Sequence, residues 1–97
     1  MRDRKVEPFE DPFIKILPHI DLHGETNDTV VWPVKDFISM QIKLGKDKIC
    51  IVHGHNHGSA LKNAIHAYLK TDTRVKRYYL YNFNSGITVA ELKVEDD

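Results

Sequence analysis

The segment from Leu61 to Leu69 constrains the fold of this chain more than any other part of the sequence. Its apolar residues recur at i, i+3, i+4, i+7 and i+8, the pattern of an amphipathic helix that faces a core. It follows a continuous apolar stretch, residues 48–52, which is typical of a central strand covered on both faces. A strand that leads into a core-facing helix is the unit of α/β folds, so we expect a domain of that class.

A second strand and helix precede this unit. Residues 19–24 have the pattern of a short strand that ends at a glycine. Residues 30–45 carry an apolar helical series, and residues 26–29 offer several side chains that favour helix caps. Pro33 must then lie in the first turn of this helix, or it kinks the helix.

A hairpin completes the predicted fold. Residues 75–83 are rich in β-branched and aromatic side chains, residues 84–86 favour a turn, and residues 87–92 alternate. The order is therefore β-α-β-α-β-β. Right-handed crossovers between the first strands imply parallel pairing, and the hairpin adds an antiparallel pair. We expect a two-layer α/β sandwich with a four-stranded mixed sheet and two helices.

The chain of 97 residues has room for one core. We expect residues 1–18 to form an N-terminal arm, residues 19–93 the domain, and residues 94–97 an acidic tail. No apolar run approaches the ~20 residues of a membrane span, and the N-terminus lacks a secretory signal. We therefore expect no membrane partner and a cytoplasmic location. Cys50 is the only cysteine, which excludes an internal disulfide, and its apolar neighbours predict a buried strand position.

The charge distribution is more informative than the net charge, which is formally zero. Residues 48–90 contain six basic side chains and a single acidic one, Asp72. Two interpretations remain open. The lysines and arginines are either scattered, solvated positions on helix and strand faces, or a surface that contacts the phosphates of a nucleic acid.

Polar residues follow both strands that lead into helices. Asp21 and His23 come at the end of the first, and His53 follows the second. Ligands of open α/β sheets bind outside the carboxyl ends of the strands, so these three side chains could converge there. The glycine-containing loop 53–59 then opens a helix, where backbone N–H groups and the helix dipole favour a phosphate. The two glycines are equally compatible with a sterically required turn.

The histidines allow a metal site as another interpretation. His53, His55 and His57 alternate, and with His23 they could bind zinc, copper, nickel or iron. A tight loop rarely points three alternate residues at one ion, and no carboxylate or cysteine lies nearby in sequence. We therefore rank a metal site below nucleic-acid binding and assign no residue as a metal ligand.

The remaining histidines and the tyrosines of residues 75–83 have less specific patterns. We expect His19 and His66 on the surface, since His66 shares the polar side of its helix with lysines. Tyr78, Tyr79 and Tyr81 either stack on unpaired bases or pack on the sheet, and the strand preference of aromatic residues favours packing.

Three blocks of sequence in this chain resemble the Smr (small MutS-related) domain family. They are Ile20-Asp21-Leu22-His23-Gly24, Ile51-Val52-His53-Gly54 with Gly58, and the block from Gly86 to Leu92. The resemblance covers about residues 19–93. It implies a β-α-β-α-β-β sandwich similar to the C-terminal domain of the third bacterial initiation factor. It also implies binding of DNA or RNA and, as in several family members, endonuclease activity.

The resemblance also implies roles for particular residues. In the family, the Asp-x-His of the first block is tied to cleavage, which corresponds to Asp21 and His23. The glycine loop is tied to substrate binding, which corresponds to His53, Gly54 and Gly58. The chain departs from the usual pattern at Asn56, which replaces the middle glycine of the loop. Asparagine is the residue best able to replace glycine at positive φ, so the loop can keep its shape.

The sequence thus predicts a nucleic-acid-binding endonuclease, with RNA favoured slightly over DNA. His23 would act as general base or acid, because imidazole titrates near neutral pH. Asp21 would orient His23 or hold a divalent cation such as Mg²⁺ or Mn²⁺. The rival hypothesis is a non-catalytic module that binds a structured nucleic acid or the ribosome. The predicted nucleic-acid contacts are His53, Gly54, His55, Asn56, Gly58, Ser59, Lys62, Arg74, Lys76 and Arg77.

Overall fold

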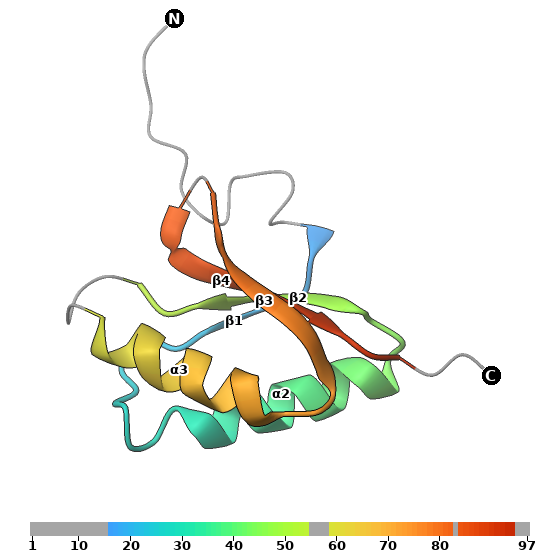
Figure 1. Cartoon of the computed structure of the whole chain (residues 1–97), viewed down its shortest axis with the longest axis horizontal. Coiled ribbons are helices and arrows are strands. Elements are labelled where there is room, and N and C mark those ends of the chain that lie inside the picture. The colour runs from blue at the N-terminus through green and yellow to red at the C-terminus, as the bar shows by residue number, and fades with distance from the viewer. Residues whose placement is uncertain (1–15, 55–58, 83, 95–97) are drawn as a thin grey trace, which may run out of the picture.

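The computed structural model describes residues 16–54, 59–82 and 84–94. Within these ranges four strands and two helices follow one another in the predicted order (Figure 1). The elements are β1 (His19–Asp21), α2 (Val31–Lys43), β2 (Lys48–Val52), α3 (Ala60–Thr71), β3 (Val75–Tyr81) and β4 (Asn84–Leu92). No helix in this part of the chain is long and apolar enough to cross a membrane.

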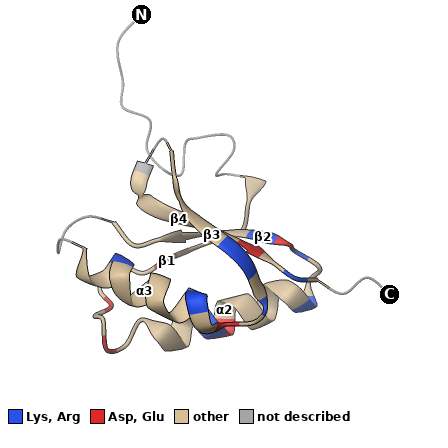
Figure 2. Ribbon diagram, viewed as in Figure 1, with Lys and Arg blue, Asp and Glu red and all other residues tan. Residues whose placement is uncertain are grey.

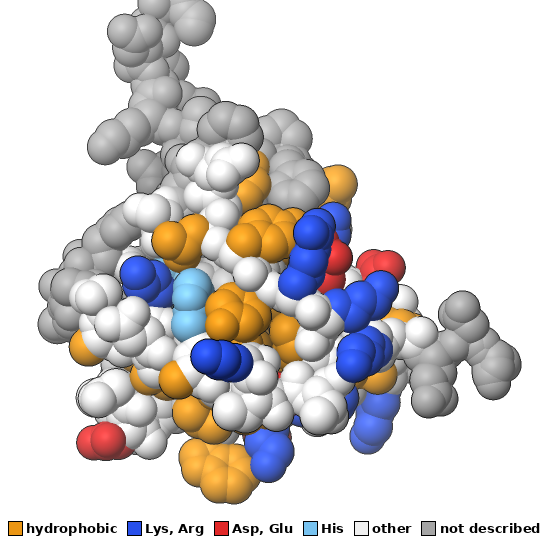
Figure 3. Space-filling view, viewed as in Figure 1, with side chains coloured by type: hydrophobic (Ala, Val, Ile, Leu, Met, Phe, Trp, Pro, Cys, Tyr) orange, Lys and Arg blue, Asp and Glu red, His pale blue; other side chains and the backbone are white. Residues whose placement is uncertain are grey.

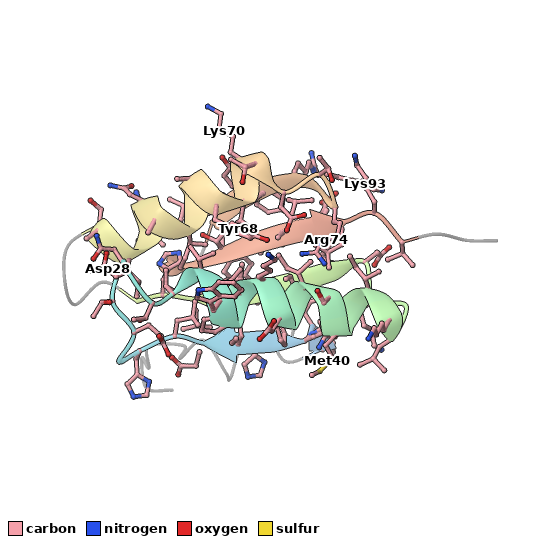
Figure 4. All side chains as sticks on the ribbon, turned by 90° about the horizontal axis from the view of Figure 1, so that it is seen from below. Asp28, Met40, Tyr68, Lys70, Arg74 and Lys93 are labelled. Atoms are coloured by element: carbon pink, nitrogen blue, oxygen red, sulfur yellow. The ribbon has the colours of Figure 1, made fainter. Side chains whose placement is uncertain are left out.

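The four strands form one mixed sheet with the order β1-β2-β4-β3. β1 and β2 are parallel, and β4 is antiparallel to both β2 and β3. Both helices cover the same face of the sheet, as the views in Figure 1 and Figure 4 agree in showing. The predicted fold class, a two-layer α/β sandwich with a four-stranded mixed sheet and two helices, is confirmed.

The main core lies between the helices and this face of the sheet. Each helix buries residues at helical spacing, as the apolar periodicity predicts. The sheet contributes every second residue of β2 and β4, because side chains alternate between the faces of a strand. Burial of each large side chain stabilises the fold by about 1.5–3 kcal/mol. The buried residues are Leu22, Val30, Val34, Ile38, Ile49, Ile51, Leu61, Ile65, Leu69, Ala90 and Leu92.

A smaller apolar cluster lies on the opposite face of the sheet. Cys50, Ile87 and Val89 are buried there, and Val52 and Tyr81 are among the partly buried residues that pack on them. The cysteine occupies a buried strand position, as its apolar neighbours predict. The face that is not covered by helices therefore has a core of its own.

The start of α2 differs from the expected side-chain cap. Val30 occupies the N-cap position and makes no side-chain cap hydrogen bond. Thr26 and Thr29 instead bond within the preceding turn, where the Thr26 backbone N–H donates to Thr29 Oγ1 at 3.0 Å. Pro33 is the third helical residue, in the first turn as required. Gly45, with a φ of +77°, follows the C-cap and ends the helix.

The expected turn at residues 84–86 was wrong. These residues belong to β4, and Asn84 already pairs with Tyr81. The pairing between β3 and β4 is irregular here, because the next pair joins Leu80 to Thr88. The Gly86 carbonyl lies in this irregular stretch and accepts hydrogen bonds from the residues that follow β2. Gly86 therefore lies in a strand and not in a turn because of its pairing with distant residues, which local sequence propensity does not describe.

Candidate functional site

Asp21 and His23 form a hydrogen-bonded pair at the carboxyl end of β1. Asp21 Oδ1 accepts the backbone N–H of His23 at 3.0 Å and lies 3.3 Å from His23 Nδ1. An Asp side chain that bonds two residues ahead is a common turn former, which explains why β1 ends here. The carboxylate can only accept, so Nδ1 carries the proton and Nε2 is the acceptor nitrogen of the neutral ring.

The pair is open to solvent. The His23 side chain is 87% exposed and that of Asp21 is 40% exposed. Gly24 follows with a φ of +92°, a left-handed conformation that turns the chain away from the sheet. Asp21 therefore orients an imidazole that a ligand in solution can reach directly.

The carboxyl end of β2 is built differently. The backbone N–H groups of His53 and Gly54 both donate to the Gly86 carbonyl, each at 2.9 Å. Gly54 has a φ of +73°, which favours glycine on backbone grounds alone. These two N–H groups hold the strand end to β4, so they are used inside the protein.

A buried hydroxyl joins two histidines beneath this turn. Thr88 Oγ1 lies 2.8 Å from His53 Nε2 and 2.7 Å from His66 Nε2. Thr88 is fully buried and His53 nearly so. The two imidazole rings meet edge to face, with centroids 6.2 Å apart. Burial, with a smaller effect of the Lys62 charge, lowers the pKa of His66, which favours its neutral form.

The hydrogen-bond partners indicate which group donates in each of the bonds that join His53, Thr88 and His66. His53 Nδ1 lies 3.3 Å from the Gly54 carbonyl oxygen, which only accepts, so Nδ1 carries the proton. When His53 carries a single proton, on Nδ1, its Nε2 accepts the Thr88 hydroxyl proton. The Thr88 oxygen in turn accepts the Nε2 proton of His66. One hydroxyl therefore connects α3, β4 and the end of β2.

The structure does not bring Asp21 and His53 together. Asp21 of β1 pairs with Val52 of β2, so the side chains of Asp21 and Val52 lie on the same face of the sheet. Val52 packs in the small cluster on the face without helices. His53 comes next in the chain and its side chain bonds Thr88 on the helix-covered face. Asp21 and His53, which we expected to converge in one crevice, thus lie on opposite faces of the sheet.

A hollow of about 310 Å³ opens near the end of β1. It lies between the loop that follows β1 and the first turn of α3. In Figure 4, where Asp28 marks that loop, the loop lies beside the start of the helix. Its lining residues are Gly24, Glu25, Thr26, Asn27, Ala60 and Leu61.

The predicted loop contacts lie partly outside the described residues. The structure does not describe residues 55–58. This range contains the predicted contacts His55, Asn56 and Gly58, and also His57 of the alternative metal site. Ser59 is the exposed N-cap residue of α3, and Asn63 Nδ2 donates to its hydroxyl at 3.4 Å. Among the residues that the structure does describe, no three His, Cys, Asp or Glu side chains are grouped so that they could hold a metal ion.

Two of the four predicted phosphate-binding side chains, Arg74 and Arg77, make ion pairs. Arg74 bonds both carboxylate oxygens of Asp72, at 3.0 and 2.8 Å, and Ser39 Oγ at 2.8 Å. Tyr68 also donates to Asp72, and Figure 4 shows Tyr68 and Arg74 close together. The Arg74 guanidinium holds the pKa of Asp72 well below its usual range. Arg74 thus ties the start of β3 to both helices.

The other three predicted phosphate-binding residues lie on α3 and β3. Arg77 pairs with Glu91 at 3.0 Å, and its guanidinium lies 5.4 Å from the centre of the Tyr79 ring. Lys76 is exposed on β3, and Lys62 is half-buried on α3. Figure 2 shows lysines and arginines on both α3 and β3. The basic residues therefore follow these two neighbouring elements.

His66 and Thr88 are the residues that sequence reasoning missed. His66 reaches the surface only in part, because it is half-buried and its imidazole bonds Thr88, a contact that the sequence did not predict. The alternation of β4 places Thr88 on the same face as Ala90 and Leu92. A hydroxyl in a core-facing position needs partners, and this was the signal available in the sequence.

Comparisons with known proteins agree with this fold. A family model of the Smr domain matches residues 20–93. Endonuclease MutS2 of Clostridium acetobutylicum is 34% identical over 77 residues, which is 76% of this chain and 10% of the relative. Endonuclease MutS2 of Acetivibrio thermocellus is 30% identical over 81 residues, 80% of this chain and again 10% of the relative. The chain thus spans about a tenth of the length of these relatives.

A solved structure is similar over most of the chain. The crystal structure of the Smr domain of Thermus thermophilus MutS2 superposes with a TM-score of 0.74 and 26% sequence identity. The match covers 78% of this chain and 98% of the other. The chain therefore belongs to the Smr domain family.

Proposed function

We propose that this chain is a nucleic-acid-binding Smr domain that cleaves a phosphodiester backbone, with RNA as the first substrate to test and DNA as the second. The observation that carries the proposal is the exposed Asp21–His23 pair. Its geometry is that of an oriented general base or acid. The relatives named Endonuclease MutS2 support the same class of reaction.

In the proposed reaction His23 Nε2 moves the proton. As base it accepts a proton from the attacking hydroxyl, and as acid it donates one to the leaving oxygen. Asp21 keeps the imidazole in the tautomer that leaves Nε2 available, and it stabilises the charged ring once the proton has arrived. The accessible lysines, Lys62 and Lys76, would position the strand through its phosphates.

A divalent cation such as Mg²⁺ or Mn²⁺ would find few protein ligands here. Asp21 supplies a single exposed carboxylate. Mg²⁺ in proteins is often held by one or two carboxylates, with water and substrate phosphates completing its shell. The single carboxylate therefore suits a cation that is held mainly by the substrate phosphate. Such a cation would neutralise negative charge on that phosphate. Activity compared in Mg²⁺, Mn²⁺ and EDTA tests whether any metal is needed.

The test uses purified protein with labelled single-stranded RNA and duplex DNA. We expect His23→Ala to slow cleavage by roughly 10²–10⁴-fold with little change in affinity, because it removes the proton-transfer group. Asp21→Asn should also slow cleavage. The pH dependence of cleavage should differ between the unmodified protein and His23→Ala. His19→Ala is the matched control, since His19 is an exposed histidine at the start of β1, the strand that ends at Asp21.

Two results would refute the catalytic role. If His23→Ala cleaves as fast as the unmodified protein, the activity comes from a contaminant. If the unmodified protein binds nucleic acid but does not cleave it in any metal condition, the chain is a binding module for a structured nucleic acid or the ribosome.

A further inference from the structure

A row of side chains on α3 lies beside a tyrosine of β3. Lys62, His66 and Lys70 follow one another at i, i+4 and i+8, so they share one side of the helix. Figure 4 shows Lys70 projecting away from the helix. The His66 ring packs against Tyr78, with centroids 4.9 Å apart and an angle of 60° between the rings. His66 thus lies between two lysines on the helix, and the Tyr78 ring packs against it.

This group is accessible from outside. His66 and Tyr78 are both half-buried, so each exposes part of its ring. Figure 3 shows a histidine on this face between a lysine and hydrophobic side chains. The Lys62 charge is close enough to His66 to lower its pKa. We call His66 and Tyr78 the ring pair.

The ring pair is held rigidly. His66 Nε2 donates to Thr88 Oγ1 at 2.7 Å, and the Thr88 hydroxyl is itself anchored by His53. Burial lowers the pKa of His66, so the ring is neutral in neutral solution. A neutral ring with a fixed plane loses little conformational freedom when a flat ligand stacks on it.

From this geometry we infer that the ring pair stacks on an unpaired base, and that Lys62 and Lys70 contact the phosphates on either side of it. Aromatic rings within a positively charged track are the usual means of binding single strands, because every base offers a flat face. A base in a duplex has both faces covered by its neighbours, so the site selects single-stranded nucleic acid. This inference rests on the proposed function and names the form of its substrate.

The test separates bases from phosphates. Fluorescence anisotropy compares a labelled single strand with a strand of equal length whose bases are replaced by abasic sites. We expect the complete strand to bind roughly 10-fold more tightly at equal salt. His66→Ala and Tyr78→Leu should remove most of this difference and leave the salt dependence unchanged. Lys62→Ala should instead flatten the salt dependence by about one phosphate contact and keep the difference.

Tyr79→Ala is the matched control on the same strand. Tyr79 pairs with Val89 and so lies on the face opposite to Tyr78, which pairs with Ala90. It should leave the preference for the complete strand unchanged. NMR of the unmodified protein adds a measurement that needs no variant, because a stacked base shifts the ring protons of His66 and Tyr78 upfield.

Equal affinity for the complete and the abasic strand, or tighter binding of a duplex, overturns the inference and leaves the proposed nuclease intact. If no nucleic acid binds at low salt, the proposed function fails as well. Unchanged ring-proton signals in a saturated complex place the bases elsewhere on the protein.

Discussion

Replacement of Thr88 by valine tests the chain of hydrogen bonds at the centre of the protein. Valine has nearly the same shape as threonine, so Thr88→Val removes the hydroxyl without leaving a cavity. The hydroxyl is fully buried and lies within 2.8 Å of both imidazole nitrogens, on His53 and His66. His53 loses this bond where water has little access, whereas half-buried His66 can turn towards solvent.

The expected cost follows from this asymmetry. An imidazole nitrogen that loses its partner inside a protein costs about 1–3 kcal/mol, and the effect at half-buried His66 adds a smaller amount. We expect the free energy of unfolding to fall by about 2 kcal/mol. For a domain of this size the melting temperature falls by roughly 8–16 °C. Urea titration followed by circular dichroism measures the first quantity, and a thermal scan the second.

Thr88→Ser provides the control, because it keeps the hydroxyl and loses one methyl group, at a cost of about 0.8 kcal/mol. The reasoning is refuted if Thr88→Val is as stable as the unmodified protein, or if serine costs more than valine. A double-mutant cycle with His66→Leu should give a coupling above roughly 0.5 kcal/mol. Additive effects would show that the hydroxyl and His66 act independently.

Four further experiments test other parts of the structure. Because burial lowers the pKa of His66 below 6.5, the unfolded chain binds that proton more tightly, so stability should decline as pH falls below about 6.5. His66→Gln should remove this decline when the free energy of unfolding is measured by urea titration at several pH values. Arg74 lowers the pKa of Asp72 from 3.8, so Asp72→Asn should cost roughly 1–3 kcal/mol at pH 7. That difference should shrink in acid below about pH 3.8, and an equal cost at all pH values would contradict the ion pair. Gly54→Ala should cost about 1–2 kcal/mol in urea because φ is +73°, with Gly54→Asn costing less, and equal stability of all three would show that the turn relaxes. Lys76→Ala should flatten the salt dependence of binding by about one phosphate contact and change stability by less than ~0.5 kcal/mol, whereas an unchanged slope would place the phosphates elsewhere.

Much of the fold followed from local patterns. The 3.6-residue period of residues 61–69 predicted α3, and the apolar stretch at residues 48–52 predicted β2 with the observed bounds. Together with the alternation of strands and helices these patterns implied the mixed sheet. They succeed because burial of a helix or strand face depends mainly on which residues of one segment are apolar.

Other features depended on pairing between distant segments. The turn expected at residues 84–86 lies inside β4, because the hydrogen bonds of Gly86 go to the end of β2. The helix cap expected at residues 26–29 was replaced by a turn whose threonines bond each other. Local propensity cannot anticipate such choices, since it contains no information on the partner.

The candidate site divides in the same way. The sequence alone determined that Asp21 and His23 are two residues apart at the end of a strand, and this spacing was enough to predict that they act together. Their hydrogen bond is local, so a short stretch of chain contains all of its atoms.

Only the tertiary structure decided the role of His53, His66 and Thr88. His53 directly follows β2, His66 lies in α3 and Thr88 in β4, and His53 and Thr88 are separated by 35 positions in the chain. Their meeting depends on the strand order and on which face of the sheet α3 covers. A buried hydroxyl must find its partners among whatever side chains the fold places beside it, and that choice is a property of the packed core.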